Sequence, residues 1–498
     1  MSFRSVAGAA RPFALAALSL AIAGTFAVPQ DASASAFQLK ENTAKGLGRA
    51  YAGSATAGGD VSVVANNPAA MADLDGTYLQ ADVTAINFSS KFSGSAHDVL
   101  GRPISGSNGG DAGTTLPVPA LSFATKVSDR VNLGIALDVP FGFQTEYDRN
   151  WVGRYDAIKT KLQSFDSTLS ASFKINDQWS VGASAIAERT NADLTNAINF
   201  NGVGLGIQQG IAAQTAAGIA QIQAAAAAGQ IPAAQAAAMI QGAVAQGQAA
   251  AAGVAAVTPP GSDGYAEVKG NSWAWGWQVG TYWKPTANDR VALDYRSRIT
   301  HDIDGTANFT TTPGYDLLLA NPALASSIPP FQRTAGKARL TNPAVASLSY
   351  WHQEEKFGLG MDVAWTQWSV MRELTLNYAN PLQPTTTLPF NWRDTWYASV
   401  GGEYYATDKL TLRAGVAVDQ APMSASNRDP RVPDAARRMA TFGIGYKASE
   451  RFEINAAYAH IFVSHAGMNG ATSATGDVLT GSFDDYGNLL SLSAQYKF

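Results

Sequence analysis

The chain has 498 residues, no cysteine and a formal net charge of −4 at neutral pH, and 15% of its residues are charged. The lack of cysteine excludes disulfides and thiolate metal sites, and the slightly acidic balance lacks the basic face that nucleic-acid binding requires. Aromatic residues make up 10% of the chain. Few charges beside many aromatic residues indicate a membrane-embedded chain rather than a soluble domain.

Residues 1–36 have the pattern of a cleavable export signal. A short basic segment precedes an apolar run at residues 13–23, and Ala34-Ser35-Ala36 is a small-x-small cleavage site. The run is too short for a membrane anchor, which takes about 20 apolar residues. We therefore expect an exported chain that begins at Phe37.

The next stretch, Phe37 to Met71, is rich in Gly, Ala, Ser and Asn and carries no apolar period. It lies between the export signal and a long series of strand-like segments. Asn67-Pro68-Ala69, near its end, is on its own an ordinary Asn-Pro turn. We predict that residues 37–76 form a plug, or hatch, inside a barrel made by residues 77–498.

From residue 77 onward, apolar and polar residues alternate as they do in β-strands. In the last segment, for example, Leu490 and Leu492 share one face while Ser491 and Ser493 share the other. Fourteen such segments are predicted, at residues 77–91, 116–127, 131–140, 166–175, 179–192, 265–284, 290–304, 338–351, 357–377, 394–405, 409–420, 437–447, 451–462 and 486–498.

Alternation alone also fits a soluble β-sandwich, but two further features favour a membrane barrel. The connections are alternately short and polar or long, which is typical of outer-membrane barrels. Trp273, Trp275 and Trp277 share a face with Trp283, ten residues or roughly 33 Å from Trp273, so that rings flank an apolar band about 25 Å tall. The sequence predicts an all-β fold, a 14-stranded antiparallel transmembrane β-barrel in the bacterial outer membrane.

Two connections stand out. Residues 201–257 are rich in Ala and Gln with high helix propensity; Gly229 would end one helix and Pro232 would start another. We expect a helical hairpin in an extracellular loop, although a low-complexity insertion fits the composition as well. Pro140-Phe141-Gly142 invites a bulge at the end of the third strand, but from the residues alone a plain strand-to-loop corner is favoured.

Catalytic and metal-binding patterns are missing from the sequence. His460 and His465 would face opposite sides of a strand, and no Ser/His/acid motif is recognisable. We predict no enzyme activity, no metal and no cofactor. Strand parity places several charges in the lumen: Asp294, Arg296, Arg298, Asp362 and Arg413. A lumen ion-pair network is the default interpretation, and the alternative is that one or two arginines bind a ligand carboxylate.

Short motifs occur in a fixed order along the chain. They are Phe37-Gln38-Leu39, the segment Gly46 to Gly53, Asn67-Pro68-Ala69, Pro140-Phe141-Gly142 with Thr145-Glu146-Tyr147, Gly270-Asn271-x-Trp273 with Gly276-Trp277, Tyr295-Arg296-Ser297, and Arg413-x-Gly415 with Asp419, Pro422, Asn427-Arg428, Pro433-Asp434 and Arg437. In this order and spacing they resemble the FadL family of outer-membrane long-chain fatty-acid transporters, over nearly all of the chain after residue 36.

The resemblance implies a monomeric barrel closed by a hatch, with Asn67, Pro68 and Ala69 as the hatch motif. A long-chain fatty acid would be captured in an extracellular groove and would pass to an internal pocket that contacts Phe37. Arg296, Arg298 and Arg413 are the candidate carboxylate partners. Hatch movement would then release the ligand, and a kink at Pro140, Phe141 and Gly142 would give a lateral exit into the lipid. Outer-membrane lipid and lipopolysaccharide are the surrounding partners.

Other functions stay open. Within the same fold, the substrate could be an aromatic hydrocarbon or another hydrophobic compound. A general aqueous porin is the alternative from a different class, and a filled lumen argues against it. An outer-membrane hydrolase would need a Ser/His pair on its lipid face, and none is found.

Overall fold

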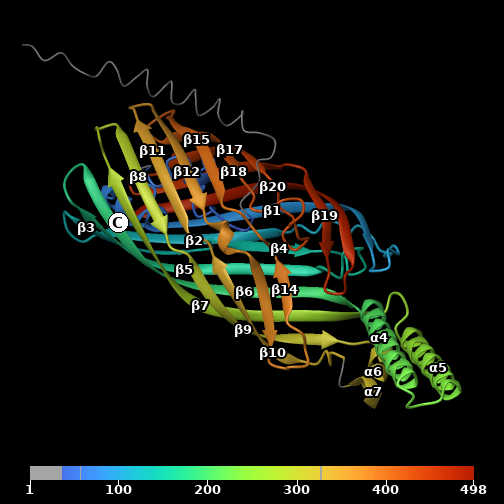
Figure 1. The fold of residues 1–498 in the computed structure, drawn as a ribbon. Coiled ribbons are helices and arrows are strands. Elements are labelled where there is room, and N and C mark those ends of the chain that lie inside the picture. The colour runs from blue at the N-terminus through green and yellow to red at the C-terminus, as the bar shows by residue number, and fades with distance from the viewer. Residues whose placement is uncertain (1–35, 57, 326–327) are drawn as a thin grey trace, which may run out of the picture.

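The computed structural model describes residues 36–56, 58–325 and 328–498. Its strands form one closed antiparallel sheet, a barrel (Figure 1). Some consecutive strands continue each other across a short break, so the wall has 14 strands, as predicted. The wall strands, in order, are β1 (Thr77–His97), β2 (Thr115–Lys126), β3 with β4 (Val131–Asp138, Gly142–Glu146), β5 (Lys159–Lys174), β6 (Trp179–Asn199), β7 (Asp263–Trp283), β8 with β9 (Asp289–Arg296, Ile299–Thr310), β11 with β10 (Val345–Gln353, Thr334–Asn342), β12 with β13 (Phe357–Thr366, Glu373–Tyr378), β15 with β14 (Thr395–Tyr405, Thr386–Pro389), β16 (Leu410–Asp419), β17 (Arg437–Lys447), β18 with β19 (Phe452–Val463, Ala466–Thr472) and β20 (Val478–Lys497).

The barrel closes between its first and last strands. β1 pairs with β20 from Tyr78 opposite Lys497 to His97 opposite Val478. Each of the fourteen predicted segments falls on one wall strand, although several strands extend further; β6, for example, runs on to Asn199.

The two faces of the wall differ as the alternation predicts. On β20, Leu490 and Leu492 are exposed on the outside, while Ser491 and Ser493 are buried inside. Trp275 is 77% exposed on the outer face of β7, and Trp179 stacks on Trp283 at 5.2 Å near the other end of the wall. An outer face with apolar residues between aromatic rings suits lipid.

Residues 36–56 and 58–76 lie inside the barrel and are called the hatch here; Figure 1 shows this blue segment enclosed by the strands. The hatch has little regular structure: the helices α2 (Ala44–Gly48) and α3 (Val63–Asn66), and the 3-10 helix η2 (Pro68–Asp73). Most of its residues are buried. Its small side chains allow the backbone to approach the wall closely: a Cβ added to Gly182 of β6 would lie 2.3 Å from the nitrogen of Ala69.

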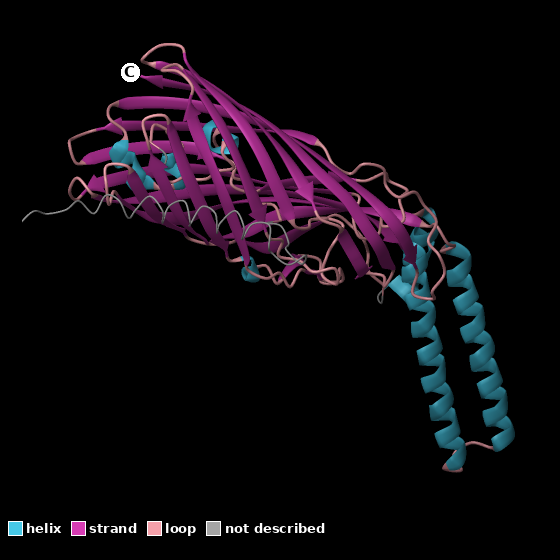
Figure 2. Ribbon diagram, turned by 90° about the horizontal axis from the view of Figure 1, so that it is seen from above, coloured by secondary structure: helices cyan, strands magenta, loops and turns pink. Residues whose placement is uncertain are grey.

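A helical hairpin projects from one end of the barrel, called the hairpin end here (Figure 2). It consists of α4 (Phe200–Ala227) and α5 (Ala233–Val257). Gly229 has a φ of +70° in the turn between them. At the base, Phe200 stacks on Tyr315 of the short helix α6 (Pro313–Leu319) at 4.2 Å. The remaining helices are α7 (Pro322–Ala325) and the 3-10 helix η3 (Trp368–Val370). Among the described residues, no helix combines the length and the hydropathy needed to cross a membrane.

Candidate functional site

The Asn-Pro-Ala segment fixes the end of the hatch to the wall. Asn67 caps η2, because its side-chain oxygen accepts a hydrogen bond from the backbone nitrogen of Ala69 at 3.0 Å. Its Nδ2 donates to the carbonyl of Thr281 on β7 at 3.2 Å. Gly280, beside it on β7, leaves the room that Asn67 occupies, since an added Cβ would lie 2.0 Å from its Oδ1. The three residues therefore form both a helix cap and a wall anchor.

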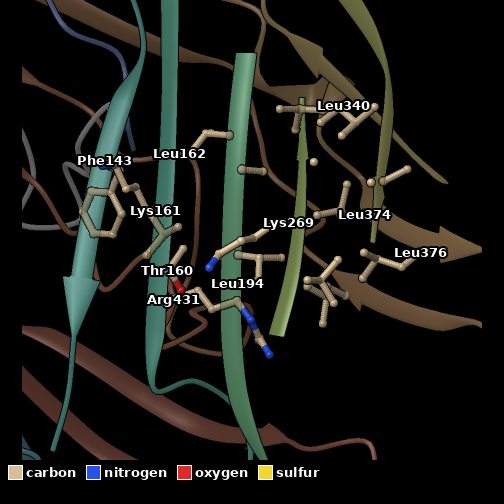
Figure 3. A pocket seen from close by; sticks show the side chains of 18 of the residues that line it. Phe143, Thr160, Lys161, Leu162, Leu194, Lys269, Leu340, Leu374, Leu376 and Arg431 are labelled. Carbon is tan, nitrogen blue, oxygen red and sulfur yellow. The ribbon is translucent and has the colours of Figure 1, made fainter. Parts of the chain in front are cut away.

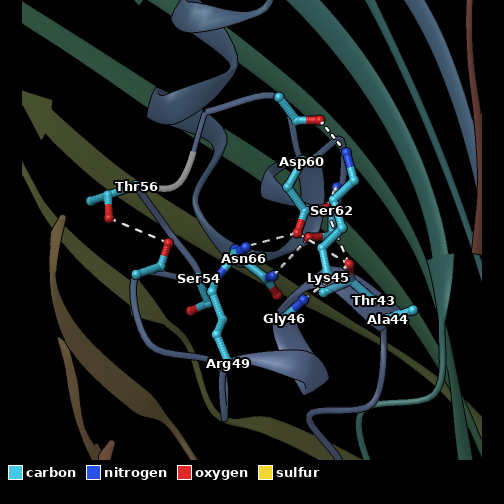
Figure 4. A network of polar contacts seen from close by, with 12 residues as sticks. Thr43, Ala44, Lys45, Gly46, Arg49, Ser54, Thr56, Asp60, Ser62 and Asn66 are labelled. Atoms are coloured by element: carbon cyan, nitrogen blue, oxygen red, sulfur yellow. Dashed lines mark hydrogen bonds and ion pairs between the residues drawn. The ribbon is translucent and has the colours of Figure 1, made fainter. Parts of the chain in front are cut away.

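A buried polar network holds the middle of the hatch (Figure 4). Asp60 accepts hydrogen bonds from Thr43 and from the backbone of Ser62, both within the hatch. Lys45 Nζ reaches the wall, at 3.1 Å from Glu453 on β18. Arg49, with 1% of its side chain exposed, lies 2.6 Å from Glu403 on β15 and 3.5 Å from Asp60. Ion pairs between hatch and wall of this kind favour the closed arrangement.

Arg413, a predicted carboxylate partner, belongs to this network. Its Nε donates to Glu403 at 2.9 Å and its Nη1 donates to Asn455 at 2.8 Å. Its side chain lies against the hatch, since a Cβ added to Gly48 would lie 3.3 Å from Arg413 Cβ. It borders none of the apolar cavities described below. Arg413 therefore belongs to a lumen ion-pair network, which was the default interpretation from the sequence.

The other two predicted arginines lie on opposite faces of the wall. Arg296 points inward and pairs with Asp166 at 2.6 Å and Glu188 at 2.9 Å. Arg298 is exposed instead, so the expectation that it shares the face of Arg296 is wrong. The reason is an extra residue between β8 and β9. Arg296 pairs with Gln278 of β7, and Asp304 pairs with Asn271 of β7. Arg296 and Asp304 are eight positions apart in the sequence, whereas their two partners are only seven positions apart. This irregularity reverses the inward and outward positions beyond it.

An apolar cavity, called the outer cavity, is lined by β5, β6 and β7 near the ends of β6 and β7 that join the helical hairpin. Figure 3 shows its lining from close by. It encloses about 850 Å³, part of which is open to solvent. Aliphatic and aromatic side chains line it, among them Phe143, Leu162, Leu194, Leu340, Leu374 and Trp392. A cavity of this size and composition suits a hydrophobic small molecule.

Cations border the outer cavity. Three of them are ion-paired: Lys269 with Glu267 at 2.6 Å, Lys337 with Asp304 at 3.2 Å and Arg431 with Asp429 at 2.7 Å. Lys161 has no ion pair within the described part of the chain. Close to Arg431 lies the buried Asp156, whose backbone carbonyl accepts a hydrogen bond from it. Burial, together with the charge of Asp429, raises the pKa of Asp156 to about 8.

Phe37 lies at the inner edge of the outer cavity and is 3% exposed. Its ring packs edge-on against Trp368 at 4.8 Å between ring centroids. The backbone beside it pairs with the wall: Gly142 donates to the carbonyl of Phe37 at 2.9 Å, and Leu39 donates to the carbonyl of Pro140 at 2.8 Å. The first residues of the hatch are thus tied to the predicted kink.

The kink is a bulge and not the plain strand-to-loop corner that the residues alone favoured. The wall strand continues as β4, and four residues separate Asp138 from Gly142 while three separate their partners on β5, Asp166 and Gln163. The extra residue reverses which positions of the strand face inward. Before the bulge the even-numbered Ala136 is buried, and after the bulge the odd-numbered Thr145 is buried. Pro140, Phe141 and Gly142 occupy this irregular segment.

The bulge leaves a gap in the wall. β2 pairs with β3 only from Leu121 to Lys126, and β4 pairs with β5 on its other side. Pro117 and Pro119 explain why β2 lacks partners along the gap. Backbone N–H groups along a strand point alternately to its two neighbours. At the end of β2, the N–H of odd-numbered Val127 points toward β3 and the N–H of even-numbered Lys126 points toward the β1 side. Prolines at the odd positions 117 and 119 therefore remove the donors that would face β4.

Behind the gap lies a second apolar cavity, called the gap cavity, of about 1050 Å³ including open space. Its walls come from β2, the bulge and the start of the hatch, including Pro117, Val118, Val139, Leu39 and Ala36. Phe143 borders both apolar cavities. The two hydrophobic spaces therefore adjoin each other beside the first residues of the hatch.

A closed barrel with a hatch in its lumen, two apolar cavities and a lipid-facing exterior defines an outer-membrane transporter for hydrophobic compounds. A family model described as "Outer membrane protein transport protein (OMPP1/FadL/TodX)" matches residues 25–498, and the chain belongs to this family. It is an outer-membrane protein.

Among curated relatives, the long-chain fatty acid transport protein of Escherichia coli (strain K12) is 26% identical over 466 residues, which cover 90% of this chain and 92% of the relative. Outer membrane protein P1 of Haemophilus influenzae (strain ATCC 51907 / DSM 11121 / KW20 / Rd) is 26% identical over 86% of both chains. The crystal structure of a Pseudomonas aeruginosa FadL homologue is 29% identical, covers 93% of this chain and 100% of its own, and has a TM-score of 0.78. The Pseudomonas putida toluene transporter TodX shares the fold, with a TM-score of 0.60 and 18% identity, over 93% of this chain and 100% of that chain.

Sequence reasoning missed several residues of the site. Pro117 and Pro119 gave a readable signal, because two prolines at alternate positions in a strand mark an unpaired edge. Lys40 and Tyr51 line a small cavity and gave no such signal, since only the folded chain creates that cavity. Arg189 of β6 is exposed, with its guanidinium over the ring of Trp273 at 5.8 Å.

Proposed function

We propose that the protein takes up long-chain fatty acids across the outer membrane. A fatty acid enters the outer cavity from the extracellular hairpin end, passes Phe37 into the gap cavity, and leaves through the gap in the wall into the lipid. The observation that carries the proposal is the position of Phe37: it borders the outer cavity, while its neighbours Ala36 and Gln38 border the gap cavity. Apolar surroundings over this route stabilise a hydrocarbon chain that a water-filled pore would not.

Capture has a candidate carboxylate partner in Lys161. This lysine borders the outer cavity and lacks an ion pair within the described residues, whereas Lys269, Lys337 and Arg431 are each paired with a carboxylate. Arg296 and Arg413 already hold wall carboxylates. Lys161 shares the outward strand face of Phe165 and Leu169, so it would meet the acid group at the outer surface of the wall, before the ligand enters the lumen.

Hatch and exit are coupled in this proposal. Residues Phe37 and Leu39 hydrogen-bond to the backbone of the bulge, so a hatch movement that withdraws them also changes the edge of the gap. The general-porin alternative is disfavoured because the hatch fills the lumen with ion pairs and buried side chains.

The second candidate function is uptake of aromatic hydrocarbons, favoured by the aromatic cluster of Phe37, Phe141, Trp368 and Trp392 next to the outer cavity. Binding of oleate and of toluene to the purified protein separates the two functions. Oleate binding with weak toluene binding supports fatty-acid uptake, and the reverse supports aromatic uptake. Binding of neither would refute both.

The lateral route has its own test. A variant with Val139 deleted and with Pro117→Thr and Pro119→Thr restores the regular register and two backbone donors along the gap. We expect oleate binding to persist in this variant while uptake by whole cells falls. Unchanged uptake would show that the ligand leaves by another path.

A further inference from the structure

Beside the gap cavity lies a smaller space, called the polar cavity, of about 420 Å³. The two cavities share four lining residues: Gln38, Glu41, Arg437 and Ile461. The gap cavity is apolar over most of its surface, whereas Lys40, Tyr51, Tyr397 and Asp419 add polar groups to the polar cavity. An apolar cavity thus adjoins a polar one across these shared residues, the arrangement that a ligand with an apolar chain and a polar head group requires.

Lys40 is a cation without a carboxylate partner. Within the described residues, no carboxylate lies in ion-pair distance of its Nζ, which instead lies over the ring of Tyr397 at 4.4 Å. Burial lowers the pKa of Lys40, while Asp419, Asp362 and Glu41 oppose this effect. An anion placed beside its Nζ would stabilise the charged form.

Tyr51 supplies an unused donor in the same cavity. It is 3% exposed, and its hydroxyl has no hydrogen-bond partner among the described residues. Burial raises the pKa of this hydroxyl well above its usual range, so that it keeps its proton. A buried hydroxyl without a partner is destabilising, and a ligand oxygen that accepts its hydrogen bond would remove that cost.

The other charged groups of the polar cavity are already engaged or weakly anionic. Arg437 donates to the carbonyl of Ala36 at 2.9 Å and pairs with Asp434 at 3.0 Å. Glu41 accepts a hydrogen bond from the backbone of Lys40 at 2.8 Å, and burial raises its pKa, which favours the neutral form. Asp419 has a partner of its own. Lys40 and Tyr51 are therefore the two groups left to receive an anion.

We propose that the gap cavity and the polar cavity together bind a fatty acid in a defined direction. Its chain lies in the gap cavity toward the opening in the wall, and its carboxylate lies in the polar cavity with Lys40 Nζ and Tyr51 Oη as donors. This inference rests on the proposed function and deepens it, because such a site prefers an acid with a long chain to a neutral aromatic hydrocarbon. It also places the acid group against the hatch itself, so that the ligand contacts the element that must move.

The test compares ligands that differ only in the head group. Oleate and oleyl alcohol are bound to the purified wild-type protein and to Lys40→Gln, Tyr51→Phe and the control Lys447→Gln, whose lysine is exposed at the far end of β17. We expect Lys40→Gln to weaken oleate binding about tenfold to a hundredfold and Tyr51→Phe to weaken it several-fold, as charge-assisted hydrogen bonds imply. Alcohol binding should change less than about threefold, and the control should match the wild type.

The outcomes separate the two proposals. If the wild type binds oleate and both variants bind it equally well, the head-group site is wrong while fatty-acid binding stands. If the wild type binds neither oleate nor oleyl alcohol, the proposed function itself fails. Folding of each variant is checked by the heat-dependent gel mobility of a closed barrel. If Lys40→Gln does not fold, Lys40→Arg replaces it in the comparison. Oleate binding should then be retained in Lys40→Arg and weakened in Tyr51→Phe.

Discussion

The ion pair between Arg49 of the hatch and Glu403 of β15 gives the sharpest test of hatch closure. Glu403 Oε1 accepts from Arg49 Nη1 at 2.6 Å and from Arg413 Nε at 2.9 Å. Glu403→Gln keeps the size of the side chain and removes its charge. The closed hatch must then bury the guanidinium of Arg49 with one remaining carboxylate, Asp60, at 3.5 Å.

The size of the effect follows from burial. Removing one partner of a buried ion pair costs about 3–5 kcal/mol, because the other charge stays desolvated. Asp60 still partly compensates the charge of Arg49, so the cost of losing the Glu403 carboxylate lies near the lower end of this range, at about 3 kcal/mol. Only the closed state carries this cost if an open hatch exposes Arg49 to water, so the population of open barrels should rise roughly 100-fold.

Ion conductance in planar bilayers measures the opening directly. We expect Glu403→Gln to open far more often than the wild type. In the matched triple variant Arg49→Met, Asp60→Asn and Glu403→Gln, neither a guanidinium at position 49 nor a carboxylate at position 60 is buried without its partner, so closure should be largely restored. Conductance like that of the wild type in Glu403→Gln would refute the reasoning. Equal leakage in the single and triple variants would also refute it, because the leak would then arise in the wall beside Arg413.

Three further predictions concern the hatch, the ligand and a loop. Deleting residues 37–71 should turn the closed barrel into a leaky one, and bilayer conductance that does not rise would contradict the plug. Phe37→Ala should weaken binding of both oleate and toluene about tenfold through lost apolar contact, with the exposed wall residue in Leu412→Ala as control; an unchanged affinity would remove Phe37 from the site. Asp156 binds its proton more tightly in the folded loop, with a pKa of about 8, than in an unfolded chain, near 4. Its contribution to stability is therefore lost as the pH rises through about 8. The protection factors of residues 147–158, which are exchange rates corrected for the base-catalysed rise of intrinsic exchange, should fall between pH 6 and pH 9 in the wild type but not in Asp156→Asn. An equal fall in both proteins would refute the assignment.

Much of the fold was predictable because a barrel wall repeats one physical rule. Outward residues meet lipid and inward residues meet the lumen, so the sequence alternates, and this alternation located all fourteen wall strands. Bulges break the rule at positions that depend on neighbouring strands. The extra residue between β8 and β9 reversed the face of Arg298 without any signal in the local sequence.

The site was less predictable than the wall. Phe37 and the Asn67-Pro68-Ala69 segment came from family resemblance, and Pro140 to Gly142 were flagged by residue type but favoured as a corner. What decides the chemistry is which cations lack partners after folding. Strand parity placed Arg296 and Arg413 in the lumen, where ion pairs were the default interpretation, and both hold carboxylates. Lys40 has no ion pair among the described residues, and no pattern in the sequence marked it. Only pairing across the lumen reveals the difference.

The seam between β1 and β20 has a consequence for how the chain acquires its structure. Tyr78 lies opposite Lys497, so the pairing that closes the barrel joins nearly the two ends of the strand region. The hatch adds contacts over a similar span, such as Lys45 with Glu453, 408 residues away. Contacts this distant in sequence carry a large loop-closure entropy and slow folding. The hatch touches both early and late strands, so its contacts repay part of that entropy once the barrel has closed. Removing the hatch should therefore weaken the closed seam as well as open the lumen.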